Sequence, residues 1–70
     1  MTTKGSEAWC LRELRAVFGR GRLPVDAMSQ LFALHKYTSA EWAALHGYVA
    51  RCWHNHVKNP KAQRGTAPRI

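Results

Sequence analysis

The stretch that decides the fold is 38–58, with the sequence TSAEWAALHGYVARCWHNHVK. It opens with a capping box, because Thr38 and Glu41 stand three residues apart and each side chain can bond the other's backbone amide. Pro60 lies just beyond the stretch and ends the helix, since proline cannot donate a backbone hydrogen bond and disfavours helical geometry in the residue before it. These signals predict one long helix over 39–58.

One face of this helix is apolar. Apolar and aromatic side chains recur along it at steps of three and four, which is the spacing of a helix that faces a core or a second copy of the chain. The residues of this stripe are Trp42, Leu45, His46, Val49, Cys52, Trp53 and His56.

Two shorter helices are expected before the long one. Ser6 is a favourable N-cap and Gly19 a stop signal, which together predict a helix over 7–18. Pro24 suits the first position of a second helix, over 24–35. The side chains expected to face the core from these two helices are Ala8, Cys10, Leu11, Leu14, Val17, Phe18, Val25, Met28, Leu31, Phe32 and His35.

The predicted fold class is all-α, because no alternating apolar and polar run is long enough for a strand. We expect one small three-helix domain over 1–59 and a flexible, basic tail over 60–70, in which no apolar face can dock. Leu, Ile, Val and Phe make up only 13 of the 70 residues. A core this small is marginal as a monomer, so a homodimer through the third helix is expected.

The sequence indicates a soluble, cytoplasmic protein. No apolar run resembles a secretory signal or approaches the roughly 18 apolar residues of a membrane-spanning helix. Cys10 and Cys52 are isolated and far apart, which favours reduced thiols over a disulfide framework.

No catalytic residue, metal site or cofactor is predicted. Each of the four acids has a capping, helix or surface role available, and nothing indicates a shared cleft. Cys52 and His56 could form a thiol–imidazole pair or hold a metal ion, but both lie on the apolar stripe, where a packed and inert cysteine is the usual case. A structural zinc needs four ligands, and His54 points elsewhere on the helix, so this pair alone would not complete a site. Whether Cys52 and His56 bind a metal with further ligands stays open.

The charge favours nucleic acid as the partner. The chain carries 11 Lys+Arg against 4 Asp+Glu, a net charge of +7, and the segment 42–70 contains five cations and no acid. A sequence-reading helix is not indicated, because the only charge at the start of the third helix is that of Glu41. We therefore expect phosphate contacts. The candidate residues are Arg20, Arg22, Arg51, Lys58, Lys61, Arg64 and Arg69.

Misplaced aromatic residues support an alternative, an acidic protein surface as the partner. Trp9 falls opposite the core stripe of its helix, and exposed Trp, Tyr and Arg are typical interface anchors. The candidate residues are Trp9, Arg12, Tyr37, Tyr48 and Trp53. The function expected from the sequence is a small, basic, non-enzymatic regulator that binds nucleic acid. The alternative is a protein-directed inhibitor or adaptor of the kind that phages and mobile elements encode.

Overall fold

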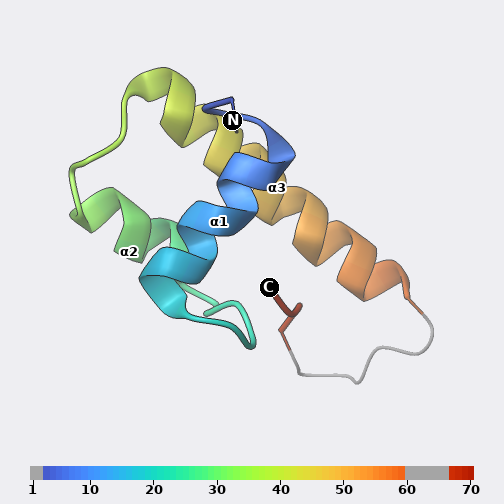
Figure 1. Ribbon diagram of the computed structural model, residues 1–70. Helices are drawn as coiled ribbons and strands as arrows, with labels where there is room; N and C mark the ends of the chain where they lie inside the picture. Colours follow the sequence, from blue (N-terminus) through green and yellow to red (C-terminus); the bar gives the residue numbers. More distant parts are fainter. Residues whose placement is uncertain (1–2, 60–66) are drawn as a thin grey trace.

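The computed structural model describes residues 3–59 and 67–70, and within them the chain forms three helices (Figure 1). They are α1 (Glu7–Phe18), α2 (Ala27–Ala33) and α3 (Ser39–Lys58). The described residues contain no strand and a single isolated β-bridge. The predicted all-α, three-helix architecture is confirmed.

The capping box starts α3 as the sequence predicts. The Glu41 amide donates to the Thr38 hydroxyl at 3.2 Å, and the Thr38 amide donates to the Glu41 carboxylate at 3.0 Å. These hydrogen bonds from the Thr38 backbone and side chain lower the pKa of Glu41. The helix ends at Lys58, so both predicted bounds are confirmed.

The first helix also follows its local signals. The Trp9 amide donates to the Ser6 hydroxyl at 3.2 Å, which caps the N-terminus of α1. Gly19 has a φ of 78° and donates its amide to the Arg15 carbonyl at 2.8 Å. A residue with a Cβ is strained at that φ, so glycine is the residue that fits this end of the helix.

The second helix is shorter than predicted. Pro24 does not begin it: the Ala27 amide bonds to the Pro24 carbonyl at 3.1 Å in a turn, and α2 starts only after that turn. At the other end, His35 has a φ of 54°, outside helical geometry. The prediction of a helix over 24–35 is wrong by three residues at the start and two at the end.

Several side chains that were expected in the core are exposed. Val25 lies before the helix and is 86% exposed, and Phe32 is 63% exposed on its outer side. On α3, His46 is exposed instead of packed, whereas Ala44, which is not part of the predicted stripe, contacts the core. Ala44 is partly covered by the segment just before α1, since a side chain at Gly5 would meet the Ala44 methyl at 3.7 Å.

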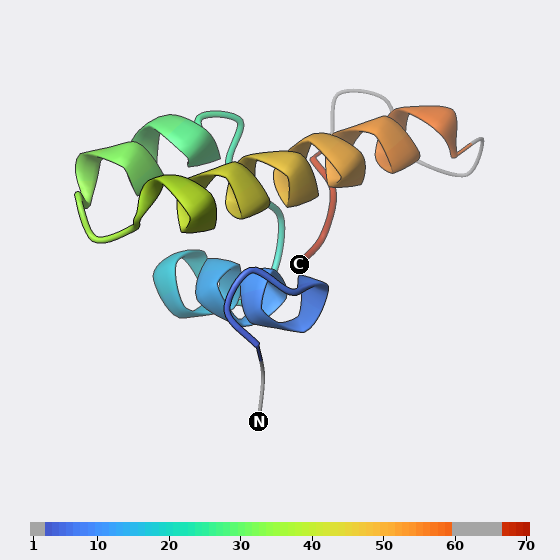
Figure 2. The same cartoon turned by 90° about the horizontal axis from the view of Figure 1, so that it is seen from above.

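The long helix is the centre of the molecule. α2 runs antiparallel beside α3, and α1 lies across one side of this pair (Figure 2). Both shorter helices pack on α3. No helix of the described part is long and apolar enough to cross a membrane. The buried core comprises Trp9, Cys10, Leu14, Leu23, Ala27, Leu31, Leu45, Val49 and Ile70.

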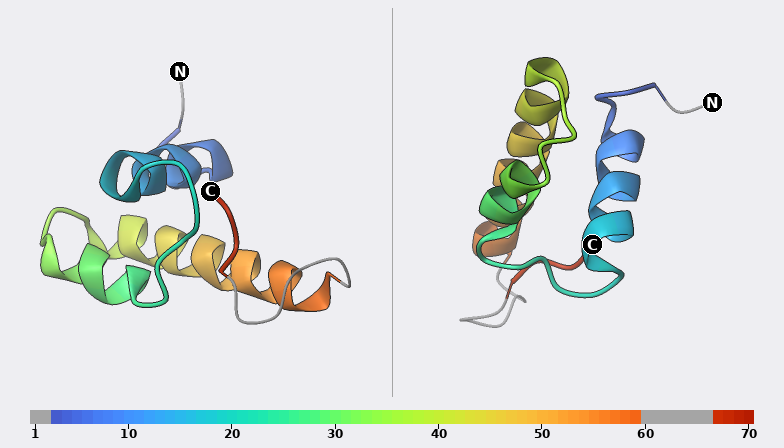
Figure 3. Two further views of the ribbon diagram at one scale, coloured as in Figure 1. Left: turned by 90° about the horizontal axis from the view of Figure 1, so that it is seen from below. Right: turned by 90° about the vertical axis from the view of Figure 1, so that its left-hand side faces the viewer.

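The last described residues pack on this core. Gly21 and Ile70 exchange backbone hydrogen bonds of 3.3 and 2.8 Å, and the Leu23 amide donates to the Pro68 carbonyl at 2.8 Å. The C-terminal segment therefore lies beside the loop that follows α1 (Figure 3). The expectation that no part of the tail docks is wrong for 67–70, because Pro68 and Ile70 are buried. Residues 60–66, with Lys61 and Arg64, lie outside the described residues.

Candidate anion-binding surface

Two arginines stand directly opposite each other where the C-terminal segment meets the loop after α1. Arg22 and Arg69 form the isolated antiparallel bridge. Because the neighbouring pair Gly21–Ile70 exchanges both backbone bonds, Arg22 and Arg69 occupy a non-hydrogen-bonded position, where side chains come closest. Like charges directly opposite each other are unfavourable in such a pair. An anion bound between the two guanidinium groups would offset the repulsion between Arg22 and Arg69.

The backbone around this pair orients both arginines outward. Leu23 and Ile70, the neighbours of Arg22 and Arg69, are buried, and successive side chains of extended backbone point to opposite sides. Both arginines are exposed. The Arg22 guanidinium also donates to the Ala67 carbonyl at 2.8 Å, which fixes its position across the bridge.

Arg20 lies in the same loop and extends the basic surface toward α1. It is exposed and stands between Gly19 and Gly21, whose φ values of 78° and 143° turn the chain away from the helix. Arg20 also lines a shallow groove along the outer side of α1, together with Arg12 and Arg15. The other residues of the groove are Ala8, Leu11 and Ala16.

We call Arg12, Arg15, Arg20, Arg22 and Arg69 the arginine surface. None of these five has an acidic partner among the described residues. The four acids of the chain are engaged elsewhere: Glu7 pairs with Arg51, Glu13 with Lys36, Asp26 with Gln30 and Glu41 with Thr38. The positive charge of this surface is therefore uncompensated by neighbouring side chains.

The nucleic-acid candidates predicted from the sequence divide into two groups. Arg20, Arg22 and Arg69 come together on the arginine surface. Arg51 instead pairs with Glu7 on the N-terminal turn of α1, and Lys58 is exposed in the last turn of α3. Lys61 and Arg64 lie outside the described residues, as stated above.

Two residues of the surface were not among those candidates. Arg15 was not singled out, and Arg12 was assigned to a protein interface. The signal was present in the sequence as a spacing, because Arg12 and Arg15 are three residues apart and are therefore neighbours on the surface of a helix.

The aromatic residues predicted to anchor a protein partner are mostly packed. Trp9 is only 4% exposed, so its predicted exposure is wrong. The loop between α2 and α3 covers it, since the Tyr37 ring meets Trp9 edge-on with centroids 6.1 Å apart. Tyr48 and Trp53 are half-buried and pack against the core. Of the five protein-interface candidates, Arg12 alone is fully exposed.

Tyr37 and its neighbour Lys36 both contact Glu13 of α1. The Tyr37 hydroxyl donates to the Glu13 carboxylate at 3.2 Å, and Lys36 reaches the same carboxylate at 3.6 Å. Burial, together with the charge and hydrogen bond of Glu13, raises the pKa of Tyr37 to about 12.

Both cysteines lie in surroundings that raise the pKa of the thiol, chiefly through burial. Both are free thiols, Cys10 buried and Cys52 half-buried. Burial raises the pKa of Cys52, which keeps it in the protonated form that is a poor nucleophile. No cluster of three or more metal-ligating side chains occurs in 3–59 and 67–70.

No family model matches this chain, and neither a curated protein nor a solved structure is similar to it.

Proposed function

We propose that the protein is a small, non-enzymatic regulator that binds nucleic acid through phosphate contacts at the arginine surface. The observation that carries the proposal is the opposed pair of Arg22 and Arg69, two exposed like charges held together by the backbone. A guanidinium group presents a planar set of donors that matches a phosphate in a bidentate arrangement. One phosphate between the two groups would satisfy both.

The rest of the surface fits a phosphate backbone. Arg20 follows on glycine-flanked chain, and Arg12 and Arg15 continue the positive charge along α1. Such contacts supply affinity and position the protein without reading bases. We therefore expect binding that weakens steeply with salt through counterion release.

A charge-matched pair of double variants tests the proposal. Replacing Arg22→Gln together with Arg69→Gln removes the opposed pair, and Lys4→Gln together with Lys58→Gln removes two exposed charges outside the surface. On duplex DNA, the arginine variant is expected to reduce the slope of log affinity against log salt by about 0.9, since the pair holds one phosphate and each neutralised phosphate contributes about 0.9. The lysine variant is expected to leave the slope close to that of the unaltered protein. Equal slopes for the two variants would reject the arginine surface as the binding site.

One observation favours the second candidate, a protein-directed adaptor or inhibitor. The groove on α1 is lined by small side chains, Ala8 and Ala16, and flanked by Arg12, Arg15 and Arg20. This composition would admit an acidic helix of a partner protein. Pull-down with and without nuclease separates the two functions, because only binding through a bridging nucleic acid is lost on nuclease treatment.

Self-association through α3 stays a prediction. The half-buried Trp53 and the 78% exposed Val57 lie in the second half of this helix, where a second copy would have to pack. Sedimentation equilibrium at micromolar concentration tests it, and a species of only 7.9 kDa would exclude the dimer.

A further inference from the structure

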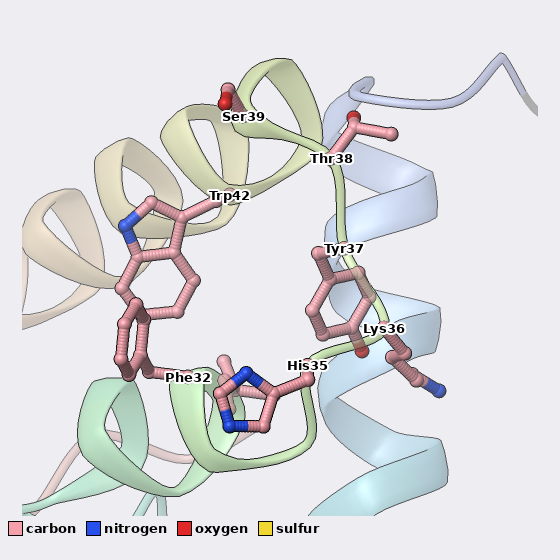
Figure 4. A pocket seen from close by; sticks show the side chains of 8 residues that line it. Phe32, His35, Lys36, Tyr37, Thr38, Ser39 and Trp42 are labelled. Carbon is pink, nitrogen blue, oxygen red and sulfur yellow. The ribbon is translucent and has the colours of Figure 1, made fainter.

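An aromatic recess lies between the end of α2 and the start of α3 (Figure 4). Its cavity measures about 240 Å³. Pockets for drug-sized ligands usually span about 300–1,000 Å³, so this recess is of a size for one ring rather than an extended molecule. Its walls are Leu31, Phe32, His35, Lys36, Tyr37, Thr38, Ser39 and Trp42.

Flat rings surround the opening. Phe32 and Trp42 meet edge-on, with centroids 5.5 Å apart and planes at 63°, and His35 lies 5.8 Å from Phe32. Tyr37 stands on the opposite side of the recess from Phe32 and Trp42 (Figure 4). Phe32 is 63% exposed, so the ring is offered to solvent instead of completing the core.

Two walls of the recess are held in place. The Tyr37 hydroxyl bonds to Glu13, and the Tyr37 ring rests against Trp9. His35 has a φ of 54°, a left-handed backbone conformation that residues other than glycine rarely adopt. Local strain of this kind persists where the surrounding structure enforces it, and it is frequent at binding sites.

The recess itself is close to neutral. Its one formal charge, Lys36, points away from the opening and pairs with Glu13 at 3.6 Å. No Asp or Glu is among its walls. An anion would find no free cation here, whereas a flat, uncharged ring would find stacking partners, with the His35 imidazole and the Ser39 hydroxyl at its edge to form hydrogen bonds.

We propose that the aromatic recess stacks one unpaired base of a single-stranded nucleic acid whose phosphates lie on the arginine surface. This inference rests on the proposed function and narrows its substrate class from nucleic acid in general to single strands. A base is the favoured occupant over an apolar side chain of a protein, because a base is joined to phosphates that the arginine surface can hold. Glu13 contacts two walls of the recess, and the next residue back along α1, Arg12, belongs to the arginine surface.

General recognition chemistry supports this arrangement. Proteins that bind single strands combine a basic track for the backbone with aromatic side chains on which bases stack, and they tolerate many sequences because every base has a flat face. Histidine and aromatic rings serve as the stacking partners of splayed bases in RNA recognition as well.

The experiment compares two labelled strands of the same length by fluorescence anisotropy. One is an oligothymidylate of about ten nucleotides, within the usual site sizes for single-strand binding, and the other is its abasic counterpart. The unaltered protein is expected to bind the oligothymidylate at least about 5-fold more tightly, since stacking one base contributes that much or more. The variant Phe32→Ala is expected to lose about 5-fold or more on oligothymidylate and nothing on the abasic strand.

The matched control is Val25→Ala, which truncates an apolar side chain that is 86% exposed and outside the recess. It is expected to bind both strands as the unaltered protein does. Because Phe32 is largely exposed, its truncation leaves the buried core intact, and circular dichroism checks that both variants stay folded.

Two results would overturn the base site. In one, the unaltered protein binds both strands equally. In the other, Phe32→Ala and Val25→Ala do not differ on oligothymidylate. After either result, the proposed function still stands if the double variant of Arg22 and Arg69 binds the abasic strand more weakly than the unaltered protein does. The recess would then be free to take a side chain of a protein. If neither strand binds the unaltered protein but duplex DNA does, this inference fails and the proposed function stands. If none of the three binds, both fail.

Discussion

The two helices that pair side by side, α2 and α3, differ in how strongly their own sequence determines them. α3 has 20 residues, a complete capping box and buried Leu45 and Val49 at its centre. α2 has seven residues and no side-chain cap hydrogen bond, and it ends just before the left-handed His35. A long helix with its own caps forms largely by local rules, whereas a two-turn helix persists only through the contacts it makes.

This difference separates the scaffold from the surface that is free to bind. Because α3 supplies the buried centre on which both other helices pack, its side chains are constrained by the fold. α2 contributes Ala27 and Leu31 to the core and leaves Phe32 outside. The less determined helix therefore leaves Phe32 exposed at the aromatic recess, and α3 completes the recess with Trp42.

The largest effect is expected from truncating the buried centre of α3. Leu45 is fully buried, so Leu45→Ala is expected to lower the free energy of unfolding by about 2–5 kcal/mol. Urea denaturation measures the loss. Val57→Ala, on the same helix at a 78% exposed position, is expected to change stability by less than about 0.5 kcal/mol. Equal losses in the two variants would contradict the central position of Leu45.

A cap variant on each helix sharpens the comparison. Thr38→Ala removes the hydroxyl that accepts from the Glu41 amide and is expected to cost about 1 kcal/mol of unfolding free energy. The side chain of Asp26, the residue before α2, bonds Gln30 and caps no amide, so Asp26→Ala is expected to cost less than about 0.5 kcal/mol. Thermal unfolding measures both losses of stability. If the Asp26 variant loses as much stability as the Thr38 variant, the Asp26 side chain does cap α2, which would contradict the comparison.

The left-handed residue after α2 gives a smaller and opposite effect. Both His35→Gly and His35→Ala remove the contact with Phe32, but only glycine adopts a φ of 54° without strain. The glycine variant is therefore expected to be more stable than the alanine variant, by up to about 1 kcal/mol. Thermal melts of the two proteins side by side test this, and an alanine variant that is the more stable would mean that the position relaxes out of the left-handed region.

The smallest effect is a pH dependence at the start of α3. The folded pKa of Glu41 lies below its ordinary value because Thr38 bonds the ionised carboxylate. A lowered folded pKa contributes stability above the unfolded value, near pH 4.3, and this contribution disappears as the pH falls through the folded pKa. Glu41→Gln is therefore expected to be less stable than the unaltered protein at pH 6 and equal to it at about pH 2. A difference that persists at low pH would assign the effect to something other than charge.

Much of the fold was predictable from short-range signals. Ser6, Gly19 and the Thr38–Glu41 box are each read from a few adjacent residues, and they place both ends of α1 and the start of α3 correctly. Pro24 misled the prediction for α2, since proline favours the first helical position but suits a preceding turn equally well.

Burial was less predictable than helix position. Trp9 and Phe32 exchanged their expected roles: the loop that contains Tyr37 covers Trp9, and α2 buries the face with Ala27 and Leu31, which leaves Phe32 outside. Helical periodicity describes a helix on its own and contains nothing about the loops that cross it. Ile70, an isolated apolar residue, has no periodicity from which burial could be inferred.

The candidate site was predictable as a composition and not as an arrangement. Arg20, Arg22 and Arg69 are recognisable in the sequence as exposed cations. Their proximity depends on a backbone pairing between residues far apart in the chain, which no local pattern indicates. The pairing of Arg51 with Glu7 likewise joins two helices and removes one expected contributor from the surface.

The docking of Ile70 beside Gly21 and Leu23 also bears on how the protein is made. The chain emerges from the ribosome N-terminus first, so α1 and the loop after it emerge before Pro68 and Ile70, with which the loop pairs. The helices can form early, but the core closes only when residue 70 has left the exit tunnel. Until then Leu23 lacks its neighbour, and the nascent chain exposes apolar surface that a contact closed earlier in synthesis would have covered.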